Sequence, residues 1–493
     1  MKIRLKNYFE ALNDNYVLIC TSNINEKNAI NKVIEHRREL VANMETLGCS
    51  IGLINGKFVI HLTGKSGMEA RESISRMTIE FIKRESNPTP SLILLSGFCW
   101  GNPNLVNEND VIVASDIIAL NSDSYSQDEY KYKATVSASK VDIKFIENKI
   151  KNVISGTIVS LESLIAKTSK RDDILALYPH VLGGEMEAWG FAPSVPNIPW
   201  AVVKSVSDFG DNLFNRDGQT LAASHAAKVT RDILGYYQSE GYLKLSSASS
   251  KYLPLVNALY GNEIKITNND VNVTNLNDYL HELSPLIQYK LGYYITGEEY
   301  GDDFIKYFSY LILETAQNSF KHGKATEVVI NFSDKNVFIQ DNGNDFDLNN
   351  LVEGQGRGGT FSWVKFKENF LDNRYVKYKF EKKKHKFNLV KVNENITRII
   401  NDCTAKIVEN KIGVGWGETD FLSYEEGCEA VYIDDRQASI PSRRFSLIGE
   451  VKRIIESGKL VFVSVSDQED KALYQTLGYG PDKLKIIVHK KYS

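Results

Sequence analysis

The sequence predicts a multidomain α/β protein in which strands alternate with helices in more than one module. Three observations support this prediction. The chain has 493 residues, a length typical of about three domains. Continuous apolar runs of strand length alternate with segments of helical periodicity. A short polar tract at residues 246–250 is typical of a linker. We therefore expect a first domain at 1–240, a connecting region at 241–300, a second domain at 301–400 and a third at 401–493.

The composition is that of an ordinary globular protein, with 42% hydrophobic and 25% charged residues. A formal net charge of -3 gives no overall basic field that would favour nucleic acid. The five cysteines are far apart and form no CxxC pair, so we expect neither a zinc site nor a disulfide framework. The N-terminus lacks a secretory pattern, and no apolar run is long enough to span a bilayer. These features favour a cytoplasmic protein without membrane contact.

Strand and helix patterns alternate through the first domain. Residues 28–43 carry a helical pattern, and residues 49–62 predict two strands around the turn pair Asn55-Gly56. Residues 91–97 form an apolar strand that is expected to end in a glycine turn at 97–101. Further strands are predicted at 16–20 and 110–116. This order predicts a parallel or mixed sheet with helices on both faces.

The chemistry of the first domain is expected at two acidic stretches. Glu185, Met186 and Glu187 follow two glycines at a predicted strand-to-helix junction. The apolar run 202–208 predicts a buried strand that carries Asp208 to its carboxyl end, where open α/β sheets bind ligands. A carboxylate that holds a sugar hydroxyl and an acid that protonates a leaving group are the groups needed to break a glycosidic bond. Alternatively, Glu185 and Glu187 are solvated acids at a helix start.

The same residues resemble the nucleoside phosphorylase and nucleosidase superfamily, and most closely its methylthioadenosine/S-adenosylhomocysteine nucleosidase branch. The similar segments are 96–101, 109–114, 185–188 and 203–208, and the resemblance covers most of residues 16–240. It implies a phosphorylase-type mixed sheet flanked by helices. It also implies that the enzyme cleaves the base–ribose bond of a purine nucleoside or nucleotide, for which ATP, NAD and a nucleoside are the candidates.

The resemblance also implies roles for individual residues. Asp208 would be the general acid on the purine, Glu187 would bind ribose hydroxyls and Glu26 would orient the attacking water. The remaining substrate-binding positions would be Met186, Glu185, Phe98 and Ser207. The glycosidase chemistry itself would require no cofactor.

Two departures from the family pattern bear on the substrate. Phe98 stands where nucleosidases often have a small residue, and Trp100 follows it, so the two rings either reshape the pocket or serve as packing residues. The strand at 92–95 has no arginine, whereas phosphate needs a cationic fork, and this favours water over phosphate as the nucleophile. Lys65 or Arg71 could still supply positive charge to phosphate or to a nucleotide.

A second group of motifs lies in residues 301–400. A predicted helix at 304–320 places Glu314 and Asn318 one turn apart on one face. Two alternating strands at 327–332 and 336–340 end at Asp341-Asn342-Gly343, and a glycine-rich segment follows at 354–360. In this order the motifs resemble the GHKL ATPase superfamily of histidine kinases, Hsp90, gyrase B and MutL, which implies an α+β sandwich.

This second resemblance implies an ATP or ADP site with Mg²⁺. Asn318 would hold the metal, Glu314 could activate water, and Asp341 with Gly343 would contact adenine. The phosphates would be wrapped by Gly354, Gly356, Gly358 and Gly359 and touched by Arg357, because glycine backbone N–H groups can close around phosphate. Whether ATP is hydrolysed or only bound stays open at this point.

Two further segments have less specific patterns. Residues 369–392 alternate aromatic residues with lysines, which predicts a hairpin with one basic face. That face is either a solvated edge strand protected by lysines or a contact for nucleic acid or a phage component. Residues 401–493 predict a small α/β domain that loosely resembles STAS-type regulatory domains, without catalysis.

Taken together, the patterns predict an N-glycosidase effector joined to a GHKL regulator. By analogy of architecture this suits bacterial antiphage defence, with a phage-derived trigger or partner protein. Relatives of both modules commonly dimerise, so a homo-oligomer is expected. One alternative is a GHKL ATPase sensor or chaperone-like protein whose first domain only binds nucleosides. Another is a housekeeping nucleosidase with an ATP sensor.

Overall fold

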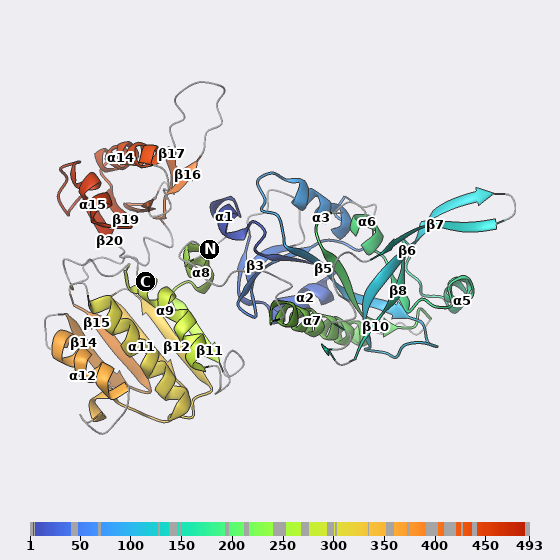
Figure 1. Ribbon diagram of the computed structural model, residues 1–493, viewed down its shortest axis with the longest axis horizontal. Coiled ribbons are helices and arrows are strands. Elements are labelled where there is room, and N and C mark those ends of the chain that lie inside the picture. Colours follow the sequence, from blue (N-terminus) through green and yellow to red (C-terminus); the bar gives the residue numbers. More distant parts are fainter. Residues whose placement is uncertain are drawn as a thin grey trace. The chain divides into compact units, whose positions relative to one another are not determined.

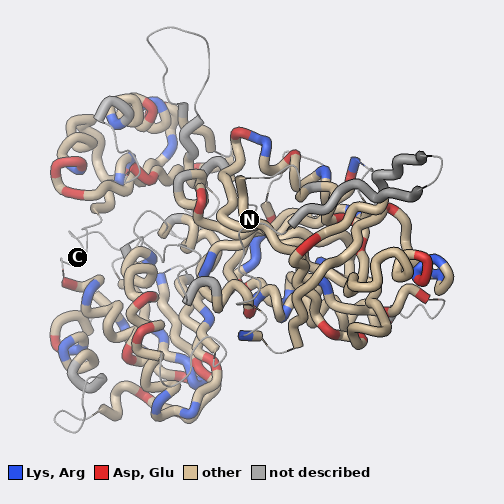
Figure 2. The backbone as a smooth tube through the Cα atoms, turned by 45° about the vertical axis from the view of Figure 1, so that its right-hand side comes forward, with Lys and Arg blue, Asp and Glu red and all other residues tan. Residues whose placement is uncertain are grey.

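The computed structural model describes most of the chain as two compact units, Met1–Ser247 and Ala248–Ser493 (Figure 1). In Figure 2 basic and acidic positions are interspersed along the backbone of both units, in keeping with the small net charge. The residues outside the description are 1–2, 4, 41–47, 68–70, 127–128, 138–145, 147–148, 151, 193–196, 212–215, 240–252, 268–275, 293–299, 301–302, 334, 352–358, 372–374, 391–402, 409–420, 425–426, 436–440 and 489–493.

The first unit is built on a ten-stranded mixed sheet in the order β10-β6-β8-β9-β5-β1-β4-β3-β2, with β7 paired to β6. An additional pairing of β10 with β5 closes part of this sheet into a ring of β5, β10, β6, β8 and β9. The strands are β1 (Val17–Thr21), β2 (Glu35–Glu39), β3 (Gly48–Ile54), β4 (Lys57–Thr63), β5 (Leu92–Gly101), β6 (Val111–Ser126), β7 (Glu129–Ser137), β8 (Val153–Ser160), β9 (Gly183–Glu185) and β10 (Trp200–Asp208).

Helices lie on both sides of this sheet, with α2 and α7 on one side and α3 and α6 on the other (Figure 1). The mixed sheet flanked by helices that the sequence predicts is therefore confirmed. Its core is apolar because both faces of the central strands are covered, as in the fully buried β1. The helical segments are η1 (Leu5–Tyr8), α1 (Phe9–Leu12), α2 (Ile24–Val33), α3 (Ile74–Lys83), α5 (Thr168–Leu177), α6 (Ala188–Phe191) and α7 (Arg216–Ser239).

Three local expectations are resolved by these elements. The turn at Asn55-Gly56 is confirmed, and both residues have positive φ angles of 50° and 72°. The helix expected at 28–43 is partly wrong, because α2 spans Ile24–Val33 and is followed by the strand β2. The glycine turn expected at 97–101 is also wrong. These residues continue β5, which stays paired with β10 as far as Trp100.

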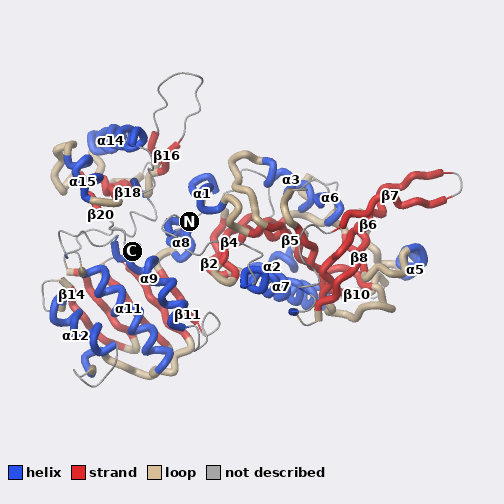
Figure 3. The backbone as a smooth tube through the Cα atoms, in the orientation of Figure 1, coloured by secondary structure: helices blue, strands red, loops and turns tan. Residues whose placement is uncertain are grey.

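The second unit contains a five-stranded antiparallel sheet in the order β11-β12-β13-β15-β14. Figure 3 shows α9, α11 and α12 together on one face of this sheet. Phenylalanine rings fill the space between the two layers, for example Phe308 stacked on Phe366 with centroids 5.0 Å apart. The elements are α8 (Leu253–Tyr260), β11 (Glu263–Thr267), α9 (Leu276–Gly292), α11 (Phe304–Lys321), β12 (Glu327–Ser333), β13 (Asn336–Asp341), η3 (Leu348–Asn350), α12 (Gly359–Phe370), β14 (Val376–Glu381) and β15 (Lys384–Leu389).

The last part of the chain forms a three-stranded parallel sheet and a two-stranded antiparallel sheet. Their strands are β16 (Lys406–Val408), β17 (Phe421–Ser423), β18 (Ala430–Asp434), β19 (Leu460–Val465) and β20 (Leu484–Val488), and the helices are α14 (Pro441–Glu456) and α15 (Gln468–Gln475). Within the described residues, no helix combines the length and the apolar character that crossing a bilayer requires.

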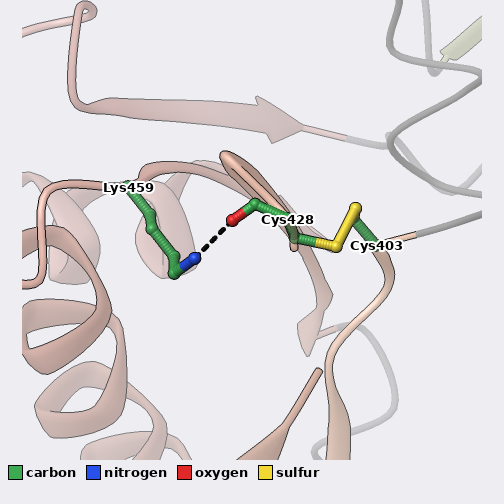
Figure 4. Close-up of a disulfide and its surroundings, with 3 residues drawn as sticks. All are labelled: Cys403, Cys428 and Lys459. Carbon is green, nitrogen blue, oxygen red and sulfur yellow. Dashed lines mark hydrogen bonds between the residues drawn. A yellow bond between two sulfur atoms is a disulfide. The ribbon is translucent and has the colours of Figure 1, made fainter. Parts of the chain in front are cut away.

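A disulfide joins Cys403 to Cys428, so the expectation of no disulfide is wrong (Figure 4). Sequence spacing could not reveal this pair, because 25 positions separate the two cysteines. The fold brings them together through a bridge between Thr404 and Tyr432, in the strand that follows Cys428. Lys459 donates a hydrogen bond to the carbonyl oxygen of Cys428. The other three cysteines are buried free thiols.

Candidate active site

The acidic residues of the first unit gather around a lysine in the middle of β10. The ammonium of Lys204 lies 2.9 Å from Glu187 Oε2. It also lies 3.9 Å from Glu26 Oε1 and 3.9 Å from Glu185 Oε2. The Lys204 side chain is only 1% exposed, and the three glutamates are buried as well. We call these four residues the Lys204 cluster.

Different elements deliver the members of the Lys204 cluster. Glu26 lies in the first turn of α2, directly after β1, and Glu185 is the last residue of β9. Glu187 immediately precedes α6. Because β5 pairs with β1 and β9 as well as with β10, these strand ends meet at one place in the sheet. The structure thus brings Glu26 together with Glu185 and Glu187, which lie about 160 positions further along the sequence.

Lys204 itself is a candidate site residue that the sequence patterns above do not single out. The sequence feature that could have identified it is a lysine in the centre of the apolar strand Trp200–Asp208. Lysine is almost never fully buried unless it is paired, so a lysine in such a strand predicts acidic neighbours.

Backbone donors hold the carboxylate of Glu26 in place. Glu26 Oε2 accepts hydrogen bonds from Ser22 N at 2.7 Å and from Ser22 Oγ at 2.9 Å. Its Oε1 accepts one from Phe98 N at 3.1 Å. This approach requires glycine at position 97, since a Cβ there would lie 1.9 Å from Glu26 Oε1. Gly97 therefore serves to admit the carboxylate and not to turn the chain.

Glu185 and Glu187 are not the solvated acids of the alternative interpretation, because both are buried. Glu185 Oε2 accepts hydrogen bonds from Glu187 N at 2.8 Å and from Ala188 N at 2.9 Å, so it does hold the start of α6. Glu187 Oε1 accepts one from Gly67 N at 3.4 Å, while its other oxygen contacts Lys204. Glu187 thus connects the loop after β4 with β10.

The three acids of the Lys204 cluster differ in the direction of their pKa shifts. Burial raises the pKa of Glu185 to about 7 against the opposing effect of Lys204, and burial also raises the pKa of Glu26. Burial alone would raise the pKa of Glu187 as well, but the Lys204 ammonium outweighs it and lowers that pKa. The three carboxylates in turn outweigh burial and raise the pKa of Lys204. Glu187 and Lys204 therefore stay charged at neutral pH, whereas Glu185 titrates there.

Asp208 ends β10, four residues beyond Lys204, and its side chain is half-buried. Its Oδ2 accepts a hydrogen bond from Ser207 Oγ at 2.7 Å, and its Oδ1 accepts one from Gly210 N at 2.8 Å. In the strand register Trp100 pairs with both Asp208 and Gly184. Asp208 and the end of β9 therefore flank the same position of β5.

Met186, Phe98 and Trp100, the other residues considered for this site, differ in their burial and packing. Met186 is half-buried between the two glutamates. Phe98 is half-buried and packs against the core shared by β1, α2 and α7. Trp100 is a buried packing residue in a cluster with Leu161 and Ile174, which favours packing over a role in a pocket.

The second unit gathers some of the residues that the sequence assigned to a nucleotide site. Asp341 ends β13, where its Oδ2 accepts a hydrogen bond from Ser319 Oγ at 2.6 Å and its Oδ1 accepts one from Gly343 N at 2.8 Å. Position 343 has room only for glycine, because a Cβ there would lie 2.4 Å from the carbonyl oxygen of Gly323. Two hydrogen bonds within the chain thus fix the Asp341 carboxylate.

Glu314 and Asn318 lie on α11, the helix that also carries Ser319. Burial raises the pKa of Glu314, and its Oε2 is buried without a hydrogen-bond partner among the described residues. Gly359 begins α12. The other predicted phosphate-contacting positions, Gly354, Gly356, Arg357 and Gly358, lie outside the described residues.

Comparison with known proteins places the resemblance in the N-terminal region. No protein-family model matches the chain. The 5'-methylthioadenosine/S-adenosylhomocysteine nucleosidase of Haemophilus influenzae strain PittEE is 27% identical over 171 residues, which are 32% of this chain and 72% of that protein. The nucleosidase of the same name from Desulfotalea psychrophila is 23% identical over 150 residues, 28% of this chain and 64% of that protein.

Among solved structures, the nucleosidase of the same name from Streptococcus pneumoniae, with a transition-state inhibitor, matches with a TM-score of 0.39 and 18% identity. The match covers 44% of this chain and 98% of that one. The N-terminal region thus resembles the Haemophilus influenzae and Desulfotalea psychrophila nucleosidases in sequence.

Proposed function

We propose that the first unit is an N-glycosidase that hydrolyses the base–ribose bond of a purine nucleoside or nucleotide. The observation that carries this proposal is the Lys204 cluster, in which three buried carboxylates share one ammonium. If all three acids are ionised, the cluster has a formal charge of -2. A fixed, buried negative charge stabilises the positive charge that develops on a ribose as its bond to the base loosens. The nucleosidases that resemble this region add support.

Each acid then has a task in that reaction. Glu187, whose lowered pKa keeps it ionised, accepts hydrogen bonds from ribose hydroxyls. Glu26 orients a water molecule, which adds its oxygen to the anomeric carbon as the bond to the base breaks and gives up a proton to the Glu26 carboxylate. Asp208 gives a proton to the purine ring, so that the base departs as a neutral molecule. Glu185 fixes the position of Glu187 through the hydrogen bond to its backbone N–H.

The charges of the site favour water over phosphate as the nucleophile. Lys204 is already engaged by three carboxylates, and the β5 residues Leu92–Leu95 offer no cation. A phosphate dianion placed here would face the negative charge of the cluster without a cationic fork to bind it.

We also propose that the second unit binds ATP or ADP with Mg²⁺ and regulates the first. The support is the preorganised carboxylate of Asp341 together with the buried oxygen of Glu314, which has no partner among the described residues. The oxygen of the Asn318 amide and that of Glu314 are the hard ligands that Mg²⁺ accepts, alongside phosphate oxygens. A nucleotide-cleaving unit under such control suits an effector of antiphage defence that an infection-derived signal releases, and the site in the second unit would then act as the switch.

The decisive experiment measures free base by chromatography after incubating the full chain with ATP, NAD, adenosine and methylthioadenosine. Wild type is expected to release base from at least one of them. Asp208→Asn should lower that rate by about 10² to 10⁴-fold, the usual contribution of a general acid. Asp173→Asn, an exposed acid on α5, is the matched control and should behave as wild type. If wild type leaves every substrate intact, with and without added ATP, the proposal is lost.

The same assay separates the alternatives for the whole chain. If the first unit only binds nucleosides and the second is a working ATPase, Glu314→Ala abolishes phosphate release and no free base appears. If the protein is an effector, Glu187→Ala abolishes base release and leaves nucleotide binding by the second unit intact. A housekeeping nucleosidase would instead release base constantly, whatever the ATP concentration.

A further inference from the structure

The five-stranded sheet of the second unit has helices on one face and, among the described residues, none on the other (Figure 3). Successive side chains of a strand point to opposite faces. On β15, His385, Phe387 and Leu389 are buried on the helix side, whereas Lys386 is exposed on the other. On β14, Lys377 and Lys379 are exposed in the same way. The hairpin with one basic face that the sequence predicts is therefore confirmed.

The strand register brings these lysines together around one aromatic ring. Lys379 on β14 lies directly opposite Lys386 on β15, which in turn lies opposite Phe338 on β13. The ammonium of Lys384 lies 4.1 Å from the centroid of the Phe338 ring, and that of Lys386 lies 5.7 Å from it. We call Lys377, Lys379, Lys384, Lys386 and Phe338 the lysine face.

Most of the charge on the lysine face is unneutralised. Lys379 forms an ion pair with Glu381, but Lys377, Lys384 and Lys386 have no carboxylate within ion-pair distance among the described residues. Glu381 is fully exposed, and yet its pKa is lowered, first by the hydrogen bond from Lys379 and further by Lys382 and Lys386. A lowered pKa at an exposed carboxylate indicates a positive local potential.

Protection of a sheet edge does not account for this arrangement. Lysines on an edge strand prevent pairing with other chains, and that explains Lys377 and Lys379 on β14. It does not explain Lys384 and Lys386, because β15 is paired on both sides. Like charges directly opposite each other, as at Lys379 and Lys386, destabilise a sheet. An anionic partner would relieve this repulsion.

We propose that the lysine face is a docking surface for single-stranded nucleic acid. Lysines that contact phosphates release condensed counterions and so provide affinity without sequence preference. An aromatic ring within the basic surface can stack on an unpaired base once the lysine above it moves onto a phosphate. A duplex hides its base faces, so the combination of one ring and several lysines fits a single strand better. This surface belongs to the second unit, and the proposal stands or falls independently of the glycosidase.

The test measures fluorescence anisotropy of a labelled 20-nucleotide oligothymidylate, and of the matching oligouridylate, titrated with the full chain between 50 and 200 mM salt. Wild type is expected to bind, with log K falling linearly against log salt. Lys384→Gln/Lys386→Gln should weaken binding at 50 mM salt about 60-fold. It should also reduce the slope by about 1.4, because each phosphate of a single strand that a lysine neutralises contributes about 0.7. Phe338→Leu, which keeps an apolar side chain, should weaken binding about tenfold and leave the slope unchanged.

The matched control removes two exposed lysines from the helices of the same unit, as Lys306→Gln/Lys367→Gln. This variant makes the same change in net charge and should bind as wild type does. The proposal is overturned if wild type shows no binding at 50 mM salt, or if the control loses as much affinity as Lys384→Gln/Lys386→Gln. It is also overturned if a duplex or inorganic polyphosphate competes as well as the oligonucleotide and Phe338→Leu binds normally.

Discussion

Replacing Lys204 by methionine tests the electrostatic basis of the candidate active site. The substitution keeps a long apolar side chain and leaves three buried carboxylates without their cation. Removing one partner of a buried ion pair typically costs about 3–5 kcal/mol, because the remaining charge stays buried and unpaired. We expect the first unit of Lys204→Met to lose stability of this order at pH 8.

The loss should depend on pH in a defined direction. A buried carboxyl whose folded-state pKa is raised, as that of Glu185 is to about 7, stabilises the fold at low pH. That contribution disappears as pH rises from the ordinary glutamate range through about 7. Without Lys204 more of the carboxyls should take up protons, so the variant should recover stability between pH 8 and pH 5. In wild type the raised pKa of Lys204 keeps the ammonium charged across this range.

The assay is calorimetric unfolding of the full chain at pH 5, 6.5 and 8, in which every transition of Lys204→Met is compared with that of wild type. Lys228→Met, which removes an exposed lysine of α7, is the control and should leave the transition in place. Lys204→Arg keeps the positive charge and should recover most of the stability. If Lys204→Met is as stable as wild type at pH 8, or if its deficit does not shrink toward pH 5, the reasoning about the cluster is refuted.

Two further predictions concern other parts of the fold. Gly97→Ala should displace the Glu26 carboxylate, which would lie 1.9 Å from the new Cβ, and lower base release at least about tenfold. Gly235→Ala, whose Cβ would meet only the end of the Asn55 side chain, should keep full activity, and equal rates for both variants would contradict this. Reduction of the Cys403–Cys428 disulfide, or Cys403→Ser with Cys428→Ser, should cost the second unit about 3 kcal/mol, from the entropy of a loop of 25 residues. Thermal unfolding with and without dithiothreitol measures this cost, and an unchanged transition would show that the bridge contributes nothing.

The sequence predicts the continuous apolar strands of the first unit, such as Trp200–Asp208, because they are buried on both sides, but it gives no strand at β2, β7 or β8. It also singles out Glu185 and Glu187 beside glycines at a predicted strand-to-helix junction, and Glu26 through the resemblance to nucleosidases. It does not predict that they meet at Lys204, because that convergence depends on β5 pairing with three other strands. The role of Gly97 escapes prediction for a related reason. A glycine in a strand signals either a turn or a close approach, and only the position of Glu26 decides between them.

If the first unit is the proposed N-glycosidase, the Lys204 cluster would favour the transition state over the bound substrate. Three carboxylates and one ammonium in a buried space carry excess negative charge, and the free protein lowers this cost partly through the raised pKa values of Glu185 and Glu26. A neutral ribose relieves little of the repulsion, whereas a ribose that has become cationic relieves much more. Interactions that strengthen only as charge develops lower the barrier without tightening substrate binding. Because the backbone N–H groups of Ser22, Phe98 and Glu187 already hold these carboxylates, the site needs little rearrangement when that charge appears.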